Sequence, residues 1–599
     1  MCSRRPSHPP PPVLGAATLA AGLLFAAACG EAPPDGPPAP LTVDATAAAG
    51  LDFVHQNGMT GELYFCEMMG AGGALFDADN DGDLDLYLVQ AGPLDAGGGP
   101  AVGDRLWRND LAPGSGGAPA LSFTDVTDGS GLAAFGYGMG VAAGDVDNDG
   151  WTDLYVTNLG PDQLWRNQGA GGDGRVTFRD ATAEAGLGDE RWSTSASFFD
   201  YDGDGWLDLY VVSYVDFRLA ANKPCRSATG RRDYCGPQSY RGETDRLYRN
   251  LGASGGAVAF EDVSGAAGIL AEAGAGMGVV ASDFDGDGRV DLYVANDQTR
   301  NLLWINRGDG TFADRALIAG CAANAEGRAE ASMGVAAGDV DNDGDDDLFM
   351  THLRYETNTL YRNDGRGVFE DATLGTRVGA PSLGATGFGA ALFDLDNDGW
   401  LDLAAVNGAV IQIEELAAAG DPFPLHQPNQ LLRHLGPAAA GGVRFAAAGP
   451  EAGGAFTVSE VSRGLAAGDV DNDGDTDLVI FNNHGPARLA LNAVGQDRPW
   501  LGLRLVGGEG REAGPRRDML GARVTLRRRG APDLLRRVHA DGSYCSAGDP
   551  RVLFGLGAGS DLEAVRVRWP DGTVEEWPPP AVGRYTTLTQ GGGRPMGEG

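Results

Sequence analysis

The chain has 599 residues and a formal net charge of −38, from 83 acidic against 45 basic side chains. This acidity argues against a nucleic-acid binder, because such proteins need a positive face to displace counterions from phosphates. The 95 glycines and 33 prolines disfavour long helical bundles, and a hydrophobic fraction of 42% disfavours disorder.

The first thirty residues have the pattern of an export signal. Arg4 and Arg5 precede an apolar stretch, residues 13–28, of signal-peptide length. Small residues then lead to Cys29, as in a bacterial lipobox, although Ala26 replaces the usual branched residue. We predict a signal at 1–29 with lipidation of Cys29, a Pro/Gly-rich tether at 30–40, and a lipoprotein of the bacterial cell envelope that touches the membrane by its lipid anchor only. A plain secretory signal is the alternative.

The cysteines agree with export. Cys225 and Cys235 bracket a short loop and predict a disulfide in an oxidising compartment. The sequence does not pair Cys66, Cys321 or Cys545.

A nine-residue Asp-rich sequence recurs seven times in the middle of the chain. Positions 1, 3, 5 and 9 are always Asp, position 6 is always Gly, and Leu follows at position 10. The copies, numbered here as loops 1 to 7, span 77–85, 145–153, 200–208, 283–291, 339–347, 394–402 and 469–477.

Carboxylates on alternate residues of a tight loop suit a hard cation such as Ca²⁺, which takes about 6–8 oxygen ligands. Gly at position 6 and Asn or Gly at position 4 allow the positive φ that a sharp bend needs. Position 7 varies, as expected if only its carbonyl binds. The predicted ligands, with position 7 acting through its backbone carbonyl, are Asp77, Asp79, Asp81, Asp83, Asp85, Asp145, Asp147, Asp149, Trp151, Asp153, Asp200, Asp202, Asp204, Trp206, Asp208, Asp283, Asp285, Asp287, Arg289, Asp291, Asp339, Asp341, Asp343, Asp345, Asp347, Asp394, Asp396, Asp398, Trp400, Asp402, Asp469, Asp471, Asp473, Asp475 and Asp477.

The surroundings of the loops predict strands rather than the helices of an EF-hand. Leu-Tyr-Val-like segments follow the loops, and Gly-Val-Ala-Ala-like segments precede them. Leu-Trp/Tyr-Arg-Asn and Phe-x-Asp segments share the same period of about 55 residues. One unit therefore has four strands, the size of a propeller blade, and seven units predict an all-β, seven-bladed propeller over 41–495. Insertions fall at 91–120, around 225–235 and at 409–460.

These loops resemble the FG-GAP/VCBS-type repeats of integrin α-subunit propellers. That resemblance implies about seven Ca²⁺ ions, mainly structural, that brace hairpins on one face. The alternative is an ion left open to a carboxylate of a partner.

The last hundred residues differ in charge and pattern. From residue 496 there are 16 arginines and 13 acidic residues, and apolar and polar residues alternate as in half-buried strands. The segments at 520–523, 542–546, 554–557 and 567–572 resemble the ASPIC/UnbV domain, which follows such propellers in bacterial members of the cartilage acidic protein-like family. We predict a small antiparallel β-domain at 496–590 and a disordered tail at 591–599.

The leading functional hypothesis is a non-enzymatic, calcium-binding scaffold for binding or adhesion, whose partner is an unknown protein or glycan at the cell surface. The rivals are a propeller-based enzyme, such as a quinoprotein dehydrogenase or polysaccharide lyase, and an assembly partner for another exported protein. Histidines are the natural candidates for catalysis, but they are scattered and lie in no acid–base motif. They are His55, His352, His426, His434, His484 and His539. The expected set of catalytic residues is empty.

Overall fold

The computed structural model describes residues 39–94, 102–112, 120–171, 175–227, 229–254, 257–436, 442–507, 516–559 and 561–597. The predicted signal, Cys29 and most of the tether lie outside these residues. Among the described residues, no helix has the length and apolar character needed to cross a membrane.

Seven sheets, or blades, carry the repeats, each with four antiparallel strands of its own, and each Asp-rich loop joins the first two of these strands. The Leu-x-Arg-Asn segments form third strands and the Phe-x-Asp segments fourth strands, as predicted. Blade 1 has β2 (Gly73–Phe76), β3 (Asp85–Leu88), β4 (Arg105–Asn109) and β5 (Phe123–Asp125); blade 2 has β6 (Gly138–Gly144), β7 (Asp153–Asn158), β8 (Gln163–Ala170) and β9 (Val176–Asp180); blade 3 has β10 (Ser193–Phe199), β11 (Asp208–Ser213), β12 (Arg246–Ser254) and β13 (Ala257–Asp262). Blade 4 has β14 (Gly276–Ser282), β15 (Asp291–Asn296), β16 (Leu302–Asn306) and β17 (Phe312–Asp314); blade 5 has β18 (Val335–Gly338), β19 (Asp347–Met350), β20 (Thr359–Asn363) and β21 (Phe369–Asp371); blade 6 has β22 (Gly387–Phe393), β23 (Asp402–Asn407), β25 (Gln430–His434) and β26 (Phe445–Ala447).

Blade 7 closes the ring with a strand from the other end of the propeller. It combines β28 (Ser462–Gly468), β29 (Asp477–Asn482) and β30 (Arg488–Asn492) with β1 (Thr42–Asp44), which pairs with β30 in the place of a fourth strand. The first strands of successive blades contact one another, and β28 contacts β2, so the seven sheets form a closed circle. The architecture is a seven-bladed propeller.

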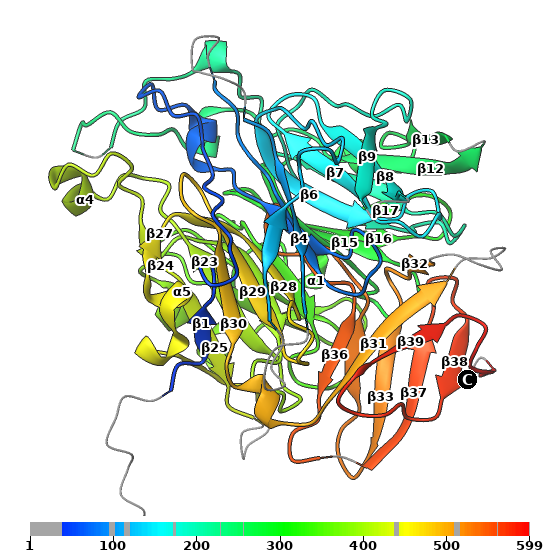
Figure 1. The fold of residues 1–599 in the computed structure, drawn as a ribbon. Helices are drawn as coiled ribbons and strands as arrows, with labels where there is room; N and C mark the ends of the chain where they lie inside the picture. Colours follow the sequence, from blue (N-terminus) through cyan, green and yellow to red (C-terminus); the bar gives the residue numbers. More distant parts are fainter. Residues whose placement is uncertain are drawn as a thin grey trace, which may run out of the picture. The chain divides into compact units, whose positions relative to one another are not determined.

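Two further sheets follow the propeller and are drawn in orange to red in Figure 1. In one, β31 (Trp500–Gly507) pairs with β32 (Arg517–Asp518), with β36 (Val552–Gly555) and, in parallel, with β39 (Tyr585–Thr589). The other has the order β34 (Leu534–Arg537), β33 (Arg523–Arg529), β37 (Asp561–Arg568), β38 (Val574–Trp577) and β40 (Arg594–Pro595). The predicted disordered tail is wrong for the part that holds β40, because these residues pair with β38.

A segment of the C-terminal region, residues 541–547, fills the centre of the ring. Its strand β35 (Ser546–Ala547) pairs in parallel with β2, the first strand of blade 1. The Cys545 N–H donates to Ser195 Oγ in β10 at 3.0 Å, and the buried Tyr544 hydroxyl donates to the Met69 carbonyl at 3.1 Å. A Cβ on Gly140 in β6 would lie 2.6 Å from the Cα of Cys545, so only glycine allows this approach. The burial of Cys545, unexplained by the sequence, follows from this position.

Helices are short and lie between the strands. They are α1 (Ala316–Ala319), α2 (Thr373–Thr376), α3 (Gly379–Ser382), α4 (Glu414–Ala418) and α5 (Gly454–Thr457), with 3₁₀ turns at Phe65–Met68, Leu219–Ala221, Pro237–Ser239, Ile269–Ala271, Pro450–Ala452 and Gly495–Asp497. A small ladder joins β24 (Gln427–Pro428) to β27 (Ser459–Glu460).

Candidate metal centres

The backbone of all seven loops bends as predicted. Position 4 has positive φ in every loop, between 53° and 59° for the five asparagines and 72° and 75° for Gly203 and Gly286. Position 6 is a glycine with φ between 86° and 104°. These two left-handed residues turn the chain so that carboxylates on alternate residues can approach one centre.

The position-9 aspartate holds each loop to its blade. In loop 2, Asp153 Oδ2 accepts the N–H of Val146 at 3.0 Å, and its Oδ1 accepts the N–H of Asn167 at 2.7 Å. The same pair of hydrogen bonds occurs in every loop. Position 9 therefore fixes the end of the loop against the second residue of the same loop and against the third strand.

The third-strand asparagine also links neighbouring blades. Asn167 Nδ2 donates to the Ala78 carbonyl of loop 1 at 2.9 Å, and Asn109 Nδ2 donates to the Val470 carbonyl of loop 7 at 2.8 Å, across the ring closure. Equivalent contacts join blades 3, 4, 5 and 7 to the preceding loop. In blade 6, His434 replaces the asparagine and stacks on Trp400 with ring centroids 4.9 Å apart, a packing role.

Positions 1, 3 and 9 converge. In at least five loops, one carboxylate oxygen from each of these positions lies within 4.8 Å of the others, a group that could hold a metal ion. Position 5 does different work in six loops, where its Oδ1 accepts the N–H of position 7. Whether position 5 and the position-7 carbonyls complete a coordination shell stays a prediction.

Several converging oxygens are buried and have no hydrogen-bond partner among the described residues. They belong to positions 1 and 3: the Oδ1 atoms of Asp77, Asp147, Asp283, Asp341 and Asp471. Burial and neighbouring carboxylates raise the pKa of Asp77 to about 7 and of Asp469 to about 7, although arginines oppose the shift. A buried carboxylate without a partner is costly, and a bound cation would supply the missing partner. The donor set fits a hard metal ion.

Third-strand arginines place a positive charge beside position 3. Arg249 lies 2.7 Å from Asp202 in loop 3, and Arg433 lies 2.6 Å from Asp396 in loop 6. Arg166 and Arg362 pair with the position-3 aspartates of loops 2 and 5. In these four blades the Arg of the Leu-x-Arg-Asn segment thus pairs with the position-3 aspartate. The Asn of the segment, where present, donates to a carbonyl of the preceding loop.

Family models and related proteins match both parts of the chain. A model described as FG-GAP-like repeat matches residues 145–211, 283–350 and 339–405, and a model described as ASPIC and UnbV matches residues 512–595. Human cartilage acidic protein 1 is 27% identical over 535 residues, covering 84% of this chain and 69% of the relative. The protein of the same name from Xenopus tropicalis is 25% identical over 534 residues, covering 84% of this chain and 70% of the relative.

The chain carries FG-GAP-like repeats and an ASPIC and UnbV domain, and it is homologous to the cartilage acidic protein 1 family.

Solved structures resemble the chain only loosely. A lectin from Burkholderia pseudomallei has a TM-score of 0.37 and 13% identity, covering 72% of this chain and 97% of the lectin. An Agrocybe aegerita lectin has a TM-score of 0.30 and 16% identity, covering 59% of this chain and 81% of the lectin.

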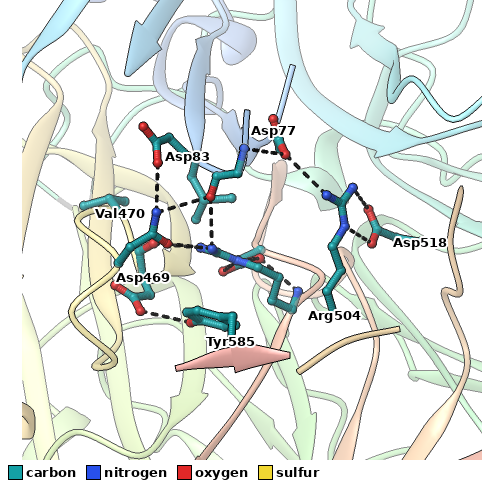
Figure 2. Close-up of polar contacts among 12 residues, drawn as sticks. Asp77, Asp83, Asp469, Val470, Arg504, Asp518 and Tyr585 are labelled. Carbon is teal, nitrogen blue, oxygen red and sulfur yellow. Dashed lines mark hydrogen bonds and ion pairs between the residues drawn. The ribbon is translucent and has the colours of Figure 1, made fainter. Parts of the chain in front are cut away.

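Residues of the C-terminal region contact the Asp-rich loops directly. Arg504 lies between Asp518, at 2.8 Å, and Asp77 of loop 1, at 3.4 Å (Figure 2). The Tyr585 hydroxyl donates to Asp469 Oδ2 of loop 7 at 3.0 Å, and Arg523 pairs with Asp283 of loop 4 at 3.3 Å. These partners act on the position-1 carboxylates, so the C-terminal region supplies an outer shell to the candidate metal sites.

Glycines allow this region to approach the loops closely. A Cβ on Gly555 would lie 2.1 Å from Asp394 Oδ2 of loop 6, and the Gly557 N–H donates to the Asn397 carbonyl at 2.9 Å. The Phe-Gly-Leu-Gly segment of the ASPIC and UnbV domain thus packs on a metal loop. No sequence pattern indicated this contact, whereas the excess of arginine after residue 495 was consistent with the ion pairs that the same region makes to the loops.

The opposite face carries a different set of contacts. Parts of residues 54–69, 214–245 and 408–429, here called the insertion cap, contact one another there. Cys225 and Cys235 form a disulfide with a Cα–Cα distance of 5.2 Å, while Cys66, Cys321 and Cys545 are free and buried. The Tyr234 hydroxyl donates to Glu67 at 3.1 Å, and Arg231 pairs with Glu414 at 3.1 Å.

Arg463 joins the insertion cap to blade 7. This buried guanidinium donates to the carbonyls of Met68, Gly408 and Ala409 at 2.6, 3.0 and 3.0 Å, and lies 4.0 Å from the Phe388 ring centroid. Burial lowers its pKa to about 9. Carbonyl oxygens replace a counter-ion as its partners.

The candidate histidines are spread over the fold. Burial lowers the pKa of His55 to about 3 and of His352 and His434 to about 4, so these three rings stay neutral at physiological pH. The His484 N–H donates to His55 Nδ1 at 3.1 Å, His426 lies 3.6 Å from Asp421, and His539 lies 3.4 Å from Asp541.

Proposed function

We propose that the chain is an exported, calcium-binding propeller that serves as a non-enzymatic scaffold for binding or adhesion at the cell surface. The observation that carries the proposal is the convergence of carboxylates at positions 1, 3 and 9 in at least five loops, together with buried carboxylate oxygens in loops 1, 2, 4, 5 and 7 that have no hydrogen-bond partner among the described residues. Oxygen-only ligands in a flexible loop favour Ca²⁺ over zinc or copper. Bound ions would neutralise the converging carboxylates and brace the hairpins.

Export is supported by two observations. The Cys225–Cys235 disulfide needs an oxidising compartment, and the relatives are named for cartilage, an extracellular tissue. We extend this to lipid attachment at Cys29. A Cys29→Ala variant should then move from the membrane fraction to the soluble periplasmic or secreted fraction.

The insertion cap is the surface that we propose for partner contact. The C-terminal region contacts the metal loops, and residues 541–547 fill the ring centre, which leaves the cap as the more accessible irregular surface. Loops carried on a rigid scaffold commonly bind partners. The partner class is a protein or glycan, and the net charge of −38 disfavours nucleic acid.

Metal analysis of the purified chain tests the calcium part of the proposal. After dialysis against a buffer that contains calcium and is free of other trace metals, we expect about seven calcium ions per chain and little zinc. One ion or none would overturn it. Turnover in a screen of glycans and of alcohols with added quinone would overturn the non-enzymatic part, whereas capture of one glycan or surface protein by the intact chain, lost on changes in the cap, would support the scaffold.

A further inference from the structure

The seven loops differ in how much negative charge their surroundings compensate. Loop 4 has four aspartates, two of which pair with Arg289 and Arg523. Loop 6 also has four aspartates, and both Arg433 and Arg498 lie 2.6 Å from Asp396. A calcium ion that enters these loops meets two positive charges already in place.

Loop 7 is the opposite case. It has five aspartates, at positions 1, 3, 5, 7 and 9, and none of them forms an ion pair with an arginine among the described residues. Its third strand carries Leu491 where blades 2, 3, 5 and 6 have the arginine that pairs with position 3, and blade 4 has Ile305 at this place. Arg551 is nearby, but it pairs with Asp549 at 2.9 Å and donates to the Asp469 carbonyl at 2.8 Å.

A second feature separates loop 7 from a mere acidic cluster. The position-7 side chain, Asp475, is 1% exposed, and neither of its carboxylate oxygens has a hydrogen-bond partner among the described residues. The position-3 residue, Asp471, has an unpartnered buried oxygen as well. The Asp471 oxygen is already desolvated, so a cation held by positions 1, 3 and 9 gains strong electrostatic stabilisation at little further desolvation cost, and the buried charge of Asp475 adds to the negative potential around it.

Loops 1, 2, 3 and 5 lie between these extremes. Loop 1 has five aspartates and one paired arginine, Arg504. Loops 2 and 3 have four aspartates each, paired with Arg166 and Arg249. Loop 5 has six acidic residues, with Arg362 and Arg537 as partners. The excess of acidic side chains over paired arginines is therefore largest in loop 7, intermediate in loops 1, 2, 3 and 5, and smallest in loops 4 and 6.

We propose that the loops form a graded set of calcium sites, in which loop 7 binds most tightly and loops 4 and 6 most weakly. The arginines that pair with ligand carboxylates set this order, because calcium affinity in such loops follows the charge of the ligand set. The inference rests on the proposed calcium binding and adds which sites fill first.

Loop 7 lies where three parts of the fold meet. Blade 7 receives β1, and Asn472 donates to Asp83 of loop 1 at 2.9 Å. The Tyr585 hydroxyl of the C-terminal region donates to Asp469 (Figure 2), and Trp500 packs against Gly474. An ion held there at low calcium would keep this junction closed while other loops are empty. Ring closure and C-terminal docking would then be the last features lost on calcium depletion.

The first test is a calcium titration of the calcium-stripped full chain, with competing chelators of graded affinity. We expect several affinity classes. Asp471→Asn in loop 7 should remove one ion from the tightest class, and the matched change Asp396→Asn in loop 6 should remove one ion from the weakest class. Seven equivalent sites, or loss of a weak ion in Asp471→Asn, would overturn the grading and leave the proposed function intact. No calcium binding would overturn both.

The second test removes a compensating charge. Arg433 is partly exposed and pairs with Asp396, so Arg433→Gln should leave the fold intact and raise the affinity of one weak site by about three- to tenfold. Arg328→Gln, at an exposed arginine paired with Glu326, is the matched control and should change no site. Equal calcium isotherms for Arg433→Gln and the control would contradict the assigned role of the arginines.

A third test uses terbium luminescence to identify the loop that binds the first ion. Trp500 packs against Gly474 of loop 7, and Trp400 is position 7 of loop 6. With Tb³⁺ as the probe, Trp500→Phe should reduce the early phase of tryptophan-sensitised emission, and Trp400→Phe the late phase. The reverse order would overturn the proposal.

Discussion

The two faces of the propeller are stabilised in different ways. On the face that carries the Asp-rich loops the same contacts recur: position 9 accepts two backbone N–H groups in every blade, and in six blades a third-strand asparagine reaches the preceding loop. On the opposite face each contact occurs once, as with the Cys225–Cys235 disulfide and the carbonyl groups around Arg463. With the proposed ions bound, the stability of the first face would depend on a solute, whereas that of the second depends on contacts within the chain. The two faces should therefore fail under different conditions.

Calcium removal should have the largest effect, and it acts on the face that carries the Asp-rich loops. Each site occupied at a hundredfold its Kd contributes about 2.7 kcal/mol, so several sites together match the whole stability of an ordinary domain, about 5–15 kcal/mol. We expect a steep fall in melting temperature with EGTA and earlier hydrogen exchange in the loops than in the insertion cap. An unchanged melting temperature, or simultaneous exchange of both faces, would contradict the comparison.

Loss of a position-9 carboxylate should be the next largest effect. Asp153→Asn replaces an acceptor of two backbone N–H groups by an amide with one acceptor oxygen, which should lower the free energy of unfolding by about 2–4 kcal/mol. The measurement is chemical denaturation in saturating calcium. Asp128→Asn, at an exposed aspartate outside the loops, is the control and should change stability by less than about 0.5 kcal/mol. Equal effects would show that position 9 does not fasten the blade.

Lowering the pH should reduce the stability of the fold through the buried His352 on the opposite face. The Ser332 hydroxyl contacts His352 Nε2 at 3.1 Å, and burial holds the pKa of His352 near 4, below its value of 6.5 in the unfolded chain. Below pH 6.5 the unfolded state binds a proton that the folded state does not, so stability falls as the pH drops from 6.5 towards 4. At pH 5 the loss from this group is about 2 kcal/mol. His352→Gln should flatten the pH dependence of unfolding over this range, and an unchanged slope would contradict the assignment.

The disulfide should have the smallest effect on global unfolding. Its loop is short and belongs to the insertion cap, so Cys225→Ser with Cys235→Ser should cost at most about 3 kcal/mol locally and less globally. We expect faster proteolysis within 218–240 and nearly unchanged calcium binding. A loss of bound calcium would show that the two faces are coupled more strongly than their contacts indicate.

The turns of the Asp-rich loops and the convergence of their carboxylates could be predicted from the sequence because these contacts are local. Asp at positions 1, 3 and 9 and Gly at position 6 are separated by few residues, and the turn brings them together within each copy. The roles of the Leu-x-Arg-Asn residues could not be predicted in the same way. Asn167 reaches a carbonyl 89 residues away, and Arg504 reaches Asp77 across 427 residues, contacts that no periodic pattern specifies.

The sequence by itself determined the repeat, the blade number, the turns and the acidic loop chemistry, since these follow from spacing and from backbone limits on single residues. The net charge is −38, and only the tertiary structure decided which of the acidic side chains are paired with arginines. It placed arginines beside selected loops, inserted residues 541–547 into the ring, and closed blade 7 with β1. The physical reason is that charge compensation and close packing depend on distances between residues far apart in the chain, which only the folded ring sets.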